Sequence, residues 1–500
     1  MKIRNFVVLA LLISVVSISG MWSQFKFWNN KNQKNQIVST GQVNNKNNID
    51  DTPLDKKKRK SQVDPKGAVV VVSLGNTDDG KGKICDFLAK DAYFFVHCQA
   101  SNALGHVVNK ENQKFTLSYI PVGILTPTVE KCYLAPGMFV DIKEFLSELR
   151  ILEKLGIVIN GRVRLSTVAH VIMPYHYDLD TCASKNACCN TAMNIKKGLA
   201  SATADKAMGV GIRIADIMHK DFPQILKKSV DRANKILVSV CHKKPYDYQK
   251  LLAEYEDYKK LLVPFIKDRT EYKINQLLSQ NKRGIFEGTH GTYMDHTHGT
   301  YPFTAPAETT AAAICASAGV GPTRIKYTLG IVKAYATYLG DGPFPTQIKD
   351  KHDLAIIKNA VEKNATEPYR FGWLDLVKIR QASALNGINF AALTRLDDLT
   401  GLKKIKVCID YDVYTSESKE PVHFDFPPPC IQDYAKVEPH YIEFDGWDED
   451  ISSVKHFSKL PESTRYFVKM IEKILSVPIV LVSVGPEDTQ TLQLDDILTW

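Results

Sequence analysis

Short apolar runs alternate with amphipathic stretches along most of this chain. The valines from Val69 to Val72 are typical of a strand buried on both faces, and comparable runs lie at 92–100, 284–288 and 477–484. We expect each of these runs to form a strand.

Between these runs, apolar residues recur at spacings of three and four, which is the pattern of amphipathic helices. One such helix is expected from Lys143 to near Gly156, with others at 83–90, 222–241 and 246–280. This alternation predicts an α/β fold, a single large domain in which helices flank a central, mostly parallel sheet.

The N-terminus has a different pattern. An apolar run at 6–18 follows two basic residues and resembles a secretory signal over 1–23. The run is shorter than the roughly 20 residues of a membrane span, so cleavage or loose membrane association is expected, and a misassigned start codon is a third explanation. Residues 24–66, rich in Asn and Lys, are typical of a disordered linker, which leaves 67–500 as the folded domain.

The formal net charge of +9 comes largely from this N-terminal part, where residues 56–60 are KKKRK. Such a run can bind phosphates or act in targeting, but like charges in a disordered tail are more often simply solvated. The folded part needs no excess of positive charge, and we predict no nucleic-acid partner.

The ten cysteines include no C-x-x-C pair, which argues against a zinc ribbon. Several lie in apolar runs, where cysteine usually serves as a small buried hydrophobe. This usage predicts reduced thiols, in conflict with the signal-like N-terminus.

The glycine-rich turn after the first strand is a candidate phosphate site. Gly75, Gly80 and Lys81 have the spacing of a nucleotide-binding loop, whose backbone amides surround an anion. Gly82 stands where such loops carry a Mg²⁺-binding hydroxyl. Asp78 is therefore the nearest candidate metal ligand and also a candidate base, whereas an ordinary surface turn is the alternative.

Two strand ends carry candidate guanine contacts. Asp397 follows a predicted strand, and its carboxylate can accept both N1–H and the exocyclic amine of guanine, which favours GTP over ATP. Aspartates at strand ends also serve as turn or helix caps. The turn from Ser483 to Pro486, after the last predicted strand, is suited to hold a flat base.

The segment 288–303 contains His290, Asp295, His296 and His298. A metal site is one interpretation. The glycines and threonines of the segment, and its lack of a helical i,i+4 histidine pair, favour a long polar loop over a ligand.

The chain resembles the adenylosuccinate synthetases, the GTP-dependent ligases of purine synthesis, over about residues 67–500. The matching stretches follow the family's order: DDGKGK at 78–83, GH at 105–106, HVIMPYHYDLD at 170–180, FEGTHGTYMDHTHGTYPF at 286–303, GDGPFPT at 340–346, GWLDLVKIR at 372–380, ALTRLDDLTGLKKIKVCIDY at 392–411, GWDEDI at 446–451 and VSVGPEDTQT at 482–491.

The resemblance implies a Mg²⁺-dependent enzyme, usually a homodimer, in which GTP phosphorylates O6 of IMP. The amine of aspartate then displaces that phosphate to give adenylosuccinate. It also implies a cytoplasmic location, whereas the signal-like N-terminus favours export or membrane attachment.

By position, the resemblance implies that Asp78 is the base that takes the purine N1 proton and is a Mg²⁺ ligand. It makes His106 the acid at the transferring phosphate and Gly105 a second Mg²⁺ ligand through its carbonyl. The implied nucleotide contacts are Thr77, Asp78, Asp79, Gly80, Lys81, Gly82, Lys83, Gly105 and His106 around the phosphates, and Arg395, Leu396, Asp397, Ser483, Val484 and Gly485 around guanine.

The substrate-binding half departs from the family pattern. Glu367 and Tyr369 stand where the family has two arginines that bind the aspartate substrate, and Arg370 lies one position along. A carboxylate in place of a bidentate cation repels an anionic substrate. The replaced positions on the IMP side are Ala103, Ile195, Gly209, His290 and Ala305.

Three hypotheses follow. The chain is a working ligase of this type, or it keeps GTP-driven activation of an oxopurine but uses a different nucleotide or amine, or it binds GTP without ligase activity. The fold and the order of the motifs favour the first, and the retained Asp78 and His106 beside the lost arginines favour the second. The signal-like N-terminus and the basic linker motivate the third.

Overall fold

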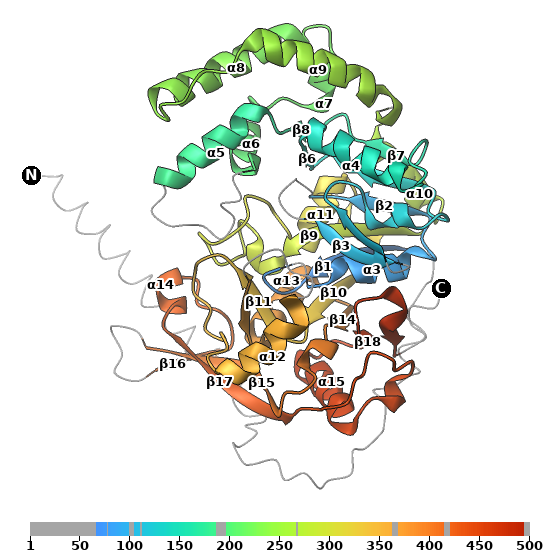
Figure 1. Cartoon of the computed structure of the whole chain (residues 1–500), viewed down its shortest axis with the longest axis vertical. Helices are drawn as coiled ribbons and strands as arrows, with labels where there is room; N and C mark the ends of the chain where they lie inside the picture. Colours follow the sequence, from blue (N-terminus) through green and yellow to red (C-terminus); the bar gives the residue numbers. More distant parts are fainter. Residues whose placement is uncertain are drawn as a thin grey trace, which may run out of the picture. The chain divides into compact units, whose positions relative to one another are not determined.

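A nine-stranded sheet forms the centre of the structure (Figure 1). The structure is a computed structural model, and it describes residues 67–77, 79–99, 105–110, 113–186, 197–266, 269–362, 369–414 and 421–494. The order of the sheet is β19-β18-β14-β10-β1-β9-β2-β5-β7, and every neighbouring pair is parallel except β18 and β19. The strands are β1 (Ala68–Ser73), β2 (Phe94–His97), β5 (Lys131–Leu134), β7 (Val163–Leu165), β9 (Gly284–Gly291), β10 (Ile325–Lys333), β14 (Phe390–Thr394), β18 (Ile479–Ser483) and β19 (Thr491–Gln493). The predicted fold class is confirmed.

The valine run explains why β1 lies at the middle of the sheet. Successive side chains of a strand point to opposite faces. Val69 and Val71 belong to the core on one face, while Val70 and Val72 belong to the core on the other, and all four are at most 2% exposed. The prediction of a strand buried on both faces is correct.

Helices pack on both faces of this sheet or against one another beyond it (Figure 1). The helices are α3 (Lys81–Ala89), α4 (Ile142–Lys154), α5 (Pro174–Asn186), α6 (Leu199–Ala207), α7 (Ile214–Met218), α8 (Phe222–Ser239), α9 (Tyr248–Leu262), α10 (Thr270–Ser279), α11 (Ala311–Ala318), α12 (Lys351–Glu362), α13 (Leu376–Asn386), α14 (Ile431–Tyr434) and α15 (Glu462–Leu475). In the described part of the chain, no helix is both long and apolar enough to cross a bilayer.

The helix expected over 246–280 is two helices. A 3-10 turn, Val263–Phe265, separates α9 from α10. Pro264 within it has no N–H to donate and cannot continue an α-helix, which is the physical reason for the break. The helix predicted from Lys143 is α4, which starts after the cap Asp141 and is followed by Gly156 at φ 79°.

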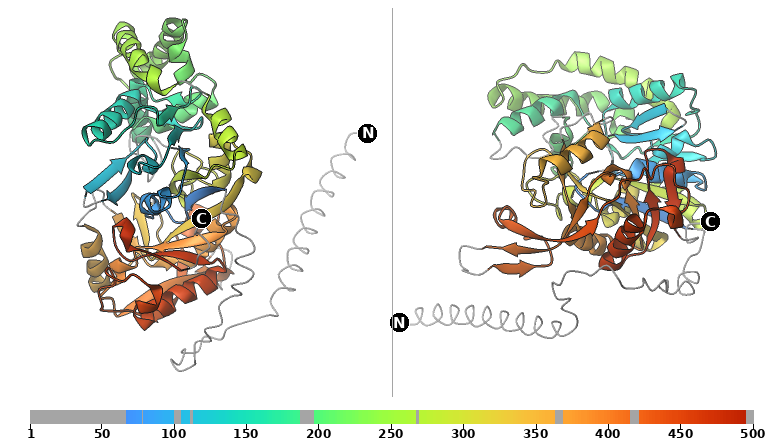
Figure 2. Two further views of the ribbon diagram at one scale, coloured as in Figure 1. Left: turned by 90° about the vertical axis from the view of Figure 1, so that its right-hand side faces the viewer. Right: turned by 60° about the horizontal axis from the view of Figure 1, so that its bottom comes forward.

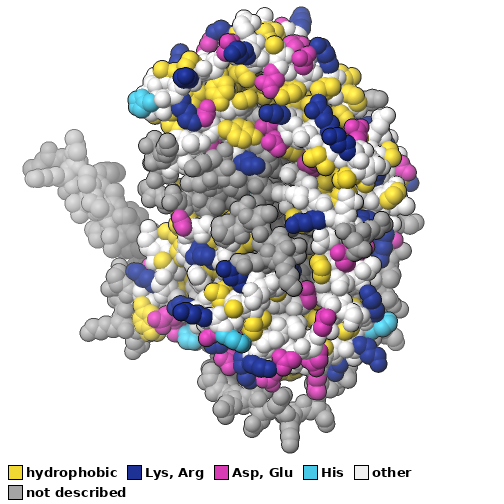
Figure 3. Space-filling model, viewed as in Figure 1, with side chains coloured by type: hydrophobic (Ala, Val, Ile, Leu, Met, Phe, Trp, Pro, Cys, Tyr) yellow, Lys and Arg dark blue, Asp and Glu magenta, His cyan; other side chains and the backbone are white. Residues whose placement is uncertain are grey.

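Smaller sheets surround the central one. An antiparallel group, drawn in orange and red in Figure 2, contains β15, β16 and β17, with β13 parallel to β15. The strands outside the central sheet are β3 (His106–Lys110), β4 (Gln113–Leu117), β6 (Phe139–Val140), β8 (His170–Val171), β11 (Ala336–Leu339), β12 (Tyr369–Gly372), β13 (Leu374–Asp375), β15 (Lys404–Val413), β16 (Val422–Phe424) and β17 (Val437–Asp445). On the face shown in Figure 3, basic and acidic side chains are interspersed, consistent with a folded part that is not a basic surface.

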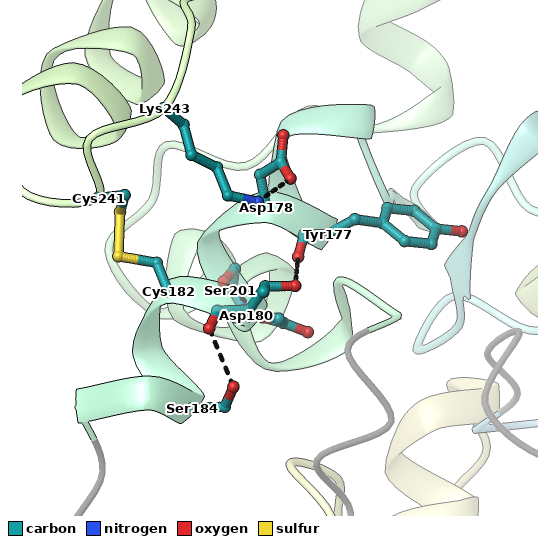
Figure 4. The surroundings of a disulfide bond; sticks show 9 residues. Tyr177, Asp178, Asp180, Cys182, Ser184, Ser201, Cys241 and Lys243 are labelled. Atoms are coloured by element: carbon teal, nitrogen blue, oxygen red, sulfur yellow. Dashed lines mark hydrogen bonds and ion pairs between the residues drawn. A yellow bond between two sulfur atoms is a disulfide. The ribbon is translucent and has the colours of Figure 1, made fainter.

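One pair of cysteines departs from the expectation of reduced thiols. Cys182 of α5 forms a disulfide with Cys241, which follows α8, and their Cα atoms are 5.5 Å apart (Figure 4). Lys243 forms an ion pair with Asp178, which lies on α5 as Cys182 does. Tyr246 Oη donates to the same carboxylate at 2.8 Å. Five other cysteines are buried as small hydrophobes, as predicted: Cys85, Cys98, Cys132, Cys315 and Cys408.

Reduction of the disulfide is expected to destabilise the fold, because the bridge joins residues separated by 59 positions. A cross-link over a loop of this length typically contributes about 2–4 kcal/mol. Urea unfolding of the full chain with and without dithiothreitol measures the effect. The Cys182→Ser/Cys241→Ser variant is the control, and an equal response of this variant to reductant would contradict the prediction.

Candidate active site

The turn at 75–80, the phosphate turn, joins β1 to α3 at the centre of the sheet. Asp79 and Gly80 have positive φ angles of 54° and 89°, and Gly80 directly precedes the first helical residue, Lys81. A helix start reached in this way presents backbone N–H groups to an anion. The turn thus has the geometry of a phosphate site, while Asp78 lies outside the described residues.

Asp79 braces the phosphate turn through its buried side chain. The carboxylate accepts hydrogen bonds from Ser73 Oγ, from the N–H of Gly75 at 3.0 Å and from Thr77 Oγ1 at 2.9 Å. The backbone carbonyl of Asp79 accepts a bond of 2.6 Å from Thr394 Oγ1 at the end of β14. Two residues predicted at the phosphates, Thr77 and Asp79, therefore hold the shape of the turn.

The end of β9 closes against the phosphate turn. Lys81, predicted at the phosphates, is fully buried, and its Nζ donates to the carbonyl of His290 at 2.6 Å. A Cβ atom on Gly291 would lie 2.1 Å from the carbonyl oxygen of Gly75. Only glycine permits this close approach, which explains part of the glycine content of the segment at 288–303.

His106 lies beside the first turn of α3. A Cβ atom on Gly82 would be 3.2 Å from the Cβ of His106, so a glycine here lets the histidine approach the helix start. The buried imidazole has its Nδ1 3.8 Å from Glu287 Oε2 and its ring centroid 5.3 Å from that of His97. The fold therefore places a buried carboxylate beside this buried imidazole.

The two predicted guanine segments meet at one edge of the sheet. They follow β14 and β18, which are parallel neighbours, and the N–H of Leu396 donates to the carbonyl of Ser483 at 3.3 Å. Arg395 has a positive φ of 60°, which turns the chain sharply after β14. Leu396 and Val484 are fully buried and anchor the two segments.

Lys83 connects this edge to the phosphate turn. Its Nζ donates to Ser483 Oγ at 2.6 Å, to the carbonyl of Gly485 at 2.5 Å and to the carbonyl of Gln490 at 3.1 Å. Burial lowers the pKa of Lys83 to about 7, against the opposite influence of Asp397. One helix start is thus linked to both the phosphate and the guanine segments.

Asp397 has an acceptor atom available for a ligand. Its Oδ1 is buried and has no hydrogen-bond partner among the described residues. Burial raises the pKa of Asp397 to about 6, and the charge of Asp398 adds to this shift. Buried acceptors are normally satisfied, so this oxygen fits the N–H donors of a base.

The segment at 288–303 is organised by its aspartate. Asp295 Oδ1 accepts from the N–H groups of Thr297 and His298, both at 2.9 Å, and Oδ2 accepts from the N–H of Thr309 at 2.5 Å. His296 and His298 are exposed. Three backbone donors therefore occupy the carboxylate that a metal site would need.

The positions that depart from the family pattern are partly described. Ala305 is fully buried, Gly209 is exposed with φ 70°, and Tyr369 lies in β12 opposite Leu339 of β11. Ala103, Ile195 and Glu367 lie outside the described residues. Arg370 packs over Tyr338 and Phe344 and donates through Nη2 to Gly342 at 2.9 Å.

Two charged residues of the site were missed from the sequence. Glu287 in β9 is fully buried beside His106 and accepts the N–H of Val122 at 3.0 Å. Lys333 ends β10, and its Nζ donates to Thr337 Oγ1 at 2.8 Å and lies 3.6 Å from Asp79 Oδ1. The sequence pattern that could have revealed these two residues is a charged residue within, or at the end of, an otherwise apolar strand.

A magnesium site at the phosphate turn depends on Asp78 and Gly105. Gly105 directly precedes β3, and a Cβ atom on it would lie 2.9 Å from Thr116 Cγ2 of β4. Elsewhere in the described residues, Asp350, His352 and Asp353 bring possible ligand atoms together, but they are mostly exposed. Asp350 Oδ1 already accepts two N–H groups there, from His352 and Asp353.

The fold and the phosphate turn define a nucleotide-binding α/β protein. A family model of adenylosuccinate synthetase matches residues 70–492, and the chain belongs to this family. It is accordingly a ligase of the type that forms a C–N bond at the expense of GTP, as predicted from the sequence.

Relatives match over nearly their whole length. The adenylosuccinate synthetases of Desulforamulus reducens and Carboxydothermus hydrogenoformans are 38% and 37% identical over 432 and 433 residues, covering 86% of this chain and 99% of each relative. The solved structure of fully ligated adenylosuccinate synthetase from Plasmodium falciparum has a TM-score of 0.78 at 26% identity, covering 87% of this chain and 100% of that one. Succinoaminodeoxyadenylate synthetase of cyanophage S-2L shares the fold, with a TM-score of 0.54 at 15% identity over 86% of this chain and 96% of that one.

Replacement of Asp79 is expected to collapse the phosphate turn. Asp79→Ala leaves the donors of Ser73, Gly75 and Thr77 without their acceptor, which lowers the free energy of unfolding by about 3 kcal/mol. Urea unfolding measures the loss. The exposed Asp448→Ala is the matched control, and equal stability of the two variants would show that the brace is not needed.

Proposed function

We propose that the chain makes adenylosuccinate from IMP, aspartate and GTP. Lys83 is the observation that carries this proposal, because it connects the start of α3 to the segments at Ser483 and Gly485. A triphosphate bound at the helix start would then extend toward a guanine beside Asp397.

The first chemical step would be removal of the N1 proton of IMP by Asp78. The electron pair released by that proton makes O6 a nucleophile, which attacks the γ-phosphorus of GTP and displaces GDP. The amine of aspartate then attacks C6, and inorganic phosphate leaves with the O6 oxygen. Asp78 is the carboxylate that the family pattern puts in this role.

His106 would stabilise the transferring phosphoryl group. Charge neutralisation and positioning supply most of the catalysis of phosphoryl transfer. Glu287 lies 3.8 Å from Nδ1 of this imidazole, and the backbone amides at the start of α3 supply positive charge toward a bound phosphate. Mg²⁺, when bound, supplies charge neutralisation on the phosphate oxygens, and the residues that would hold it are Asp78 and Gly105.

A second candidate keeps the same activation chemistry with another nucleotide or amine. The substitutions on the acceptor side favour it, because Tyr369 and Glu367 stand where arginines would bind the carboxylates of aspartate. The homodimer and the cytoplasmic location implied by the family, and the signal-like N-terminus, remain predictions.

Turnover tests the two candidates together. The purified 67–500 chain is incubated with GTP and Mg²⁺, and phosphate release and 6-substituted product are measured with IMP and aspartate and with a panel of other 6-oxopurine nucleotides and amines. Product with IMP and aspartate supports the first candidate. Product only with another pair supports the second, and GTP binding without any turnover would refute both.

The base is tested by Asp78→Asn. Loss of a general base typically lowers turnover by about 100- to 10,000-fold, while the unfolding midpoint stays unchanged because the amide has the same shape. Asp448→Asn, on the exposed surface, is the matched control. Retention of normal turnover by Asp78→Asn would remove the assignment.

Guanine recognition is tested through Asp397. Because burial raises the pKa of Asp397 to about 6, its carboxylate is ionised above this pH and becomes protonated as the pH falls from 7.5 to 5. Protonation removes an acceptor for N1–H and the amine, so GTP affinity is expected to fall by about 10- to 100-fold across this range.

Asp397→Asn is expected to abolish this pH dependence. The new amide can accept from N1–H and donate to a 2-oxo group, so xanthosine triphosphate should replace GTP as the preferred donor. Equilibrium binding of both nucleotides at pH 5 to 7.5 measures the change. An unaltered preference for GTP would show that the base does not bind at Asp397.

A further inference from the structure

A lysine that the reaction scheme does not use is buried near the phosphate turn. Lys378, in the first turn of α13, is 4% exposed. Its Nζ lies 4.4 Å from the ring centroid of Tyr293 and 5.1 Å from that of Tyr434. Asp375, three residues earlier, is buried as well and accepts hydrogen bonds from the N–H of Lys378 and from Tyr411 Oη.

A buried cation is an expensive feature for stability alone. A buried charge, even one with an oppositely charged neighbour, often contributes no more to stability than well-packed apolar residues would. Burial lowers the pKa of Lys378 to about 8, with Asp375 acting in the opposite direction, so the site disfavours the charge that it holds. The contacts of the ammonium group therefore point to a role beyond the fold.

The ammonium group reaches the phosphate turn. Lys378 Nζ donates to Asn76 Oδ1 at 3.0 Å, and Asn76 directly follows Gly75 in that turn. Among the described residues, Asn76 Oδ1 is the one acceptor recorded for this Nζ. Since lysine only donates hydrogen bonds, this contact fixes which end of the Asn76 side chain faces Lys378.

The other end of the Asn76 amide is a donor that lacks an acceptor. Its Nδ2 is buried, and no hydrogen-bond partner for it exists among the described residues. A small cavity adjoins it and is lined by Gly75, Asn76, Lys333, Thr337, Asp375 and Lys378. A buried donor at the edge of a cavity beside a phosphate turn fits an oxygen of a bound anion.

We propose that Lys378 is a positioning residue that orients the Asn76 amide, so that Asn76 Nδ2 donates to an oxyanion of a bound substrate. This rests on the proposed function, in which two substrates bring such oxygens to the phosphate turn; IMP is not one of them, because its 5′-phosphate lies at the opposite end of the nucleotide from the O6 that attacks GTP. They are the phosphate of GTP and the carboxylates of the amino-acid substrate. The motif around Lys378 and the turn around Asn76 are far apart in sequence, and the fold brings them together.

Binding measurements on the full chain separate the two sources. One arm titrates GTP with Mg²⁺, and the other titrates aspartate in the presence of IMP and a non-hydrolysable GTP analogue. Asn76→Ala is expected to lower the binding affinity for one of the two ligands by about 10- to 100-fold, because a hydrogen bond to a charged group is lost. Weaker GTP binding identifies the phosphate, and weaker aspartate binding identifies the carboxylate.

A double-mutant cycle tests whether Lys378 acts through Asn76. Lys378→Met is made together with Asp375→Asn, so that no unpaired carboxylate stays buried, and Asp375→Asn alone is the control. Lys378→Met with Asp375→Asn should lower the affinity for the same ligand that Asn76→Ala affects. Combining these two changes with Asn76→Ala should lower that affinity no further. Lys403→Met, which removes an exposed lysine, should leave binding unchanged.

The outcomes decide the proposal. If Asn76→Ala leaves both ligands within twofold of the parent chain, the proposal is wrong, and this variant suffices should the Lys378 variant fail to fold. The proposal is also wrong if the Lys378 change lowers the ligand affinity of the Asn76→Ala variant by as much as it lowers that of the parent chain. Absence of turnover in the parent chain refutes the proposed function instead, while GTP binding still reports on Asn76.

Discussion

The buried carboxylate of Asp79 is the constraint on which the site depends. This carboxylate accepts hydrogen bonds from Ser73 at the end of β1 and from Gly75 and Thr77 of the phosphate turn. The backbone carbonyl of Asp79 accepts a hydrogen bond from Thr394 on β14. Because these contacts define the path from strand to helix, they also set the direction in which α3 starts. Lys83 and Gly82 lie in the first turn of that helix. Lys83 contacts Ser483 at the end of β18 and Gly82 contacts His106, so the direction of the helix also sets the positions of these two residues relative to the phosphate turn.

Several charged side chains around this turn are buried or nearly so. Lys333 lies near Asp79, Lys378 lies near Asp375, and Glu287 lies near His106. Removing so many charges from water brings little net stability, whereas it supplies fixed dipoles and charges that need no rearrangement during phosphoryl transfer. The central sheet allows this arrangement, because its apolar cores on both faces supply the stability that the charged centre does not.

Local patterns in the sequence were enough to predict the central strand, the glycine-rich turn that follows it and the strands that end at Thr394 and Ser483. They depend on neighbouring residues, such as the valine run and the glycines that follow it. Pro264 was visible in the sequence, yet the apolar spacing on either side of it favoured one helix where the structure has two. The pair of Cys182 with Cys241, and the approach of Glu287 to His106, depend on contacts between distant segments, which spacing alone does not reveal. The roles assigned to the site residues remain predictions, and Asp78, Ile195 and Glu367 also lie outside the described part of the chain.

The two halves of the predicted site are held in different ways. The donor half is fixed to the ends of neighbouring strands in one sheet, where a shift of any strand would disturb both cores. Tyr369 and Arg370 instead belong to the two-stranded pair of β11 and β12. Gly209 follows a short helix, and a Cβ atom added to it would meet no atom of the described residues within 4 Å. Substitution at such peripheral positions alters the charge offered to an acceptor substrate without moving the phosphate turn. A family member with altered side chains at Tyr369, Arg370 or Gly209 can therefore keep the geometry of the phosphate turn, whereas His290, whose carbonyl accepts from Lys81 Nζ, is tied to that turn.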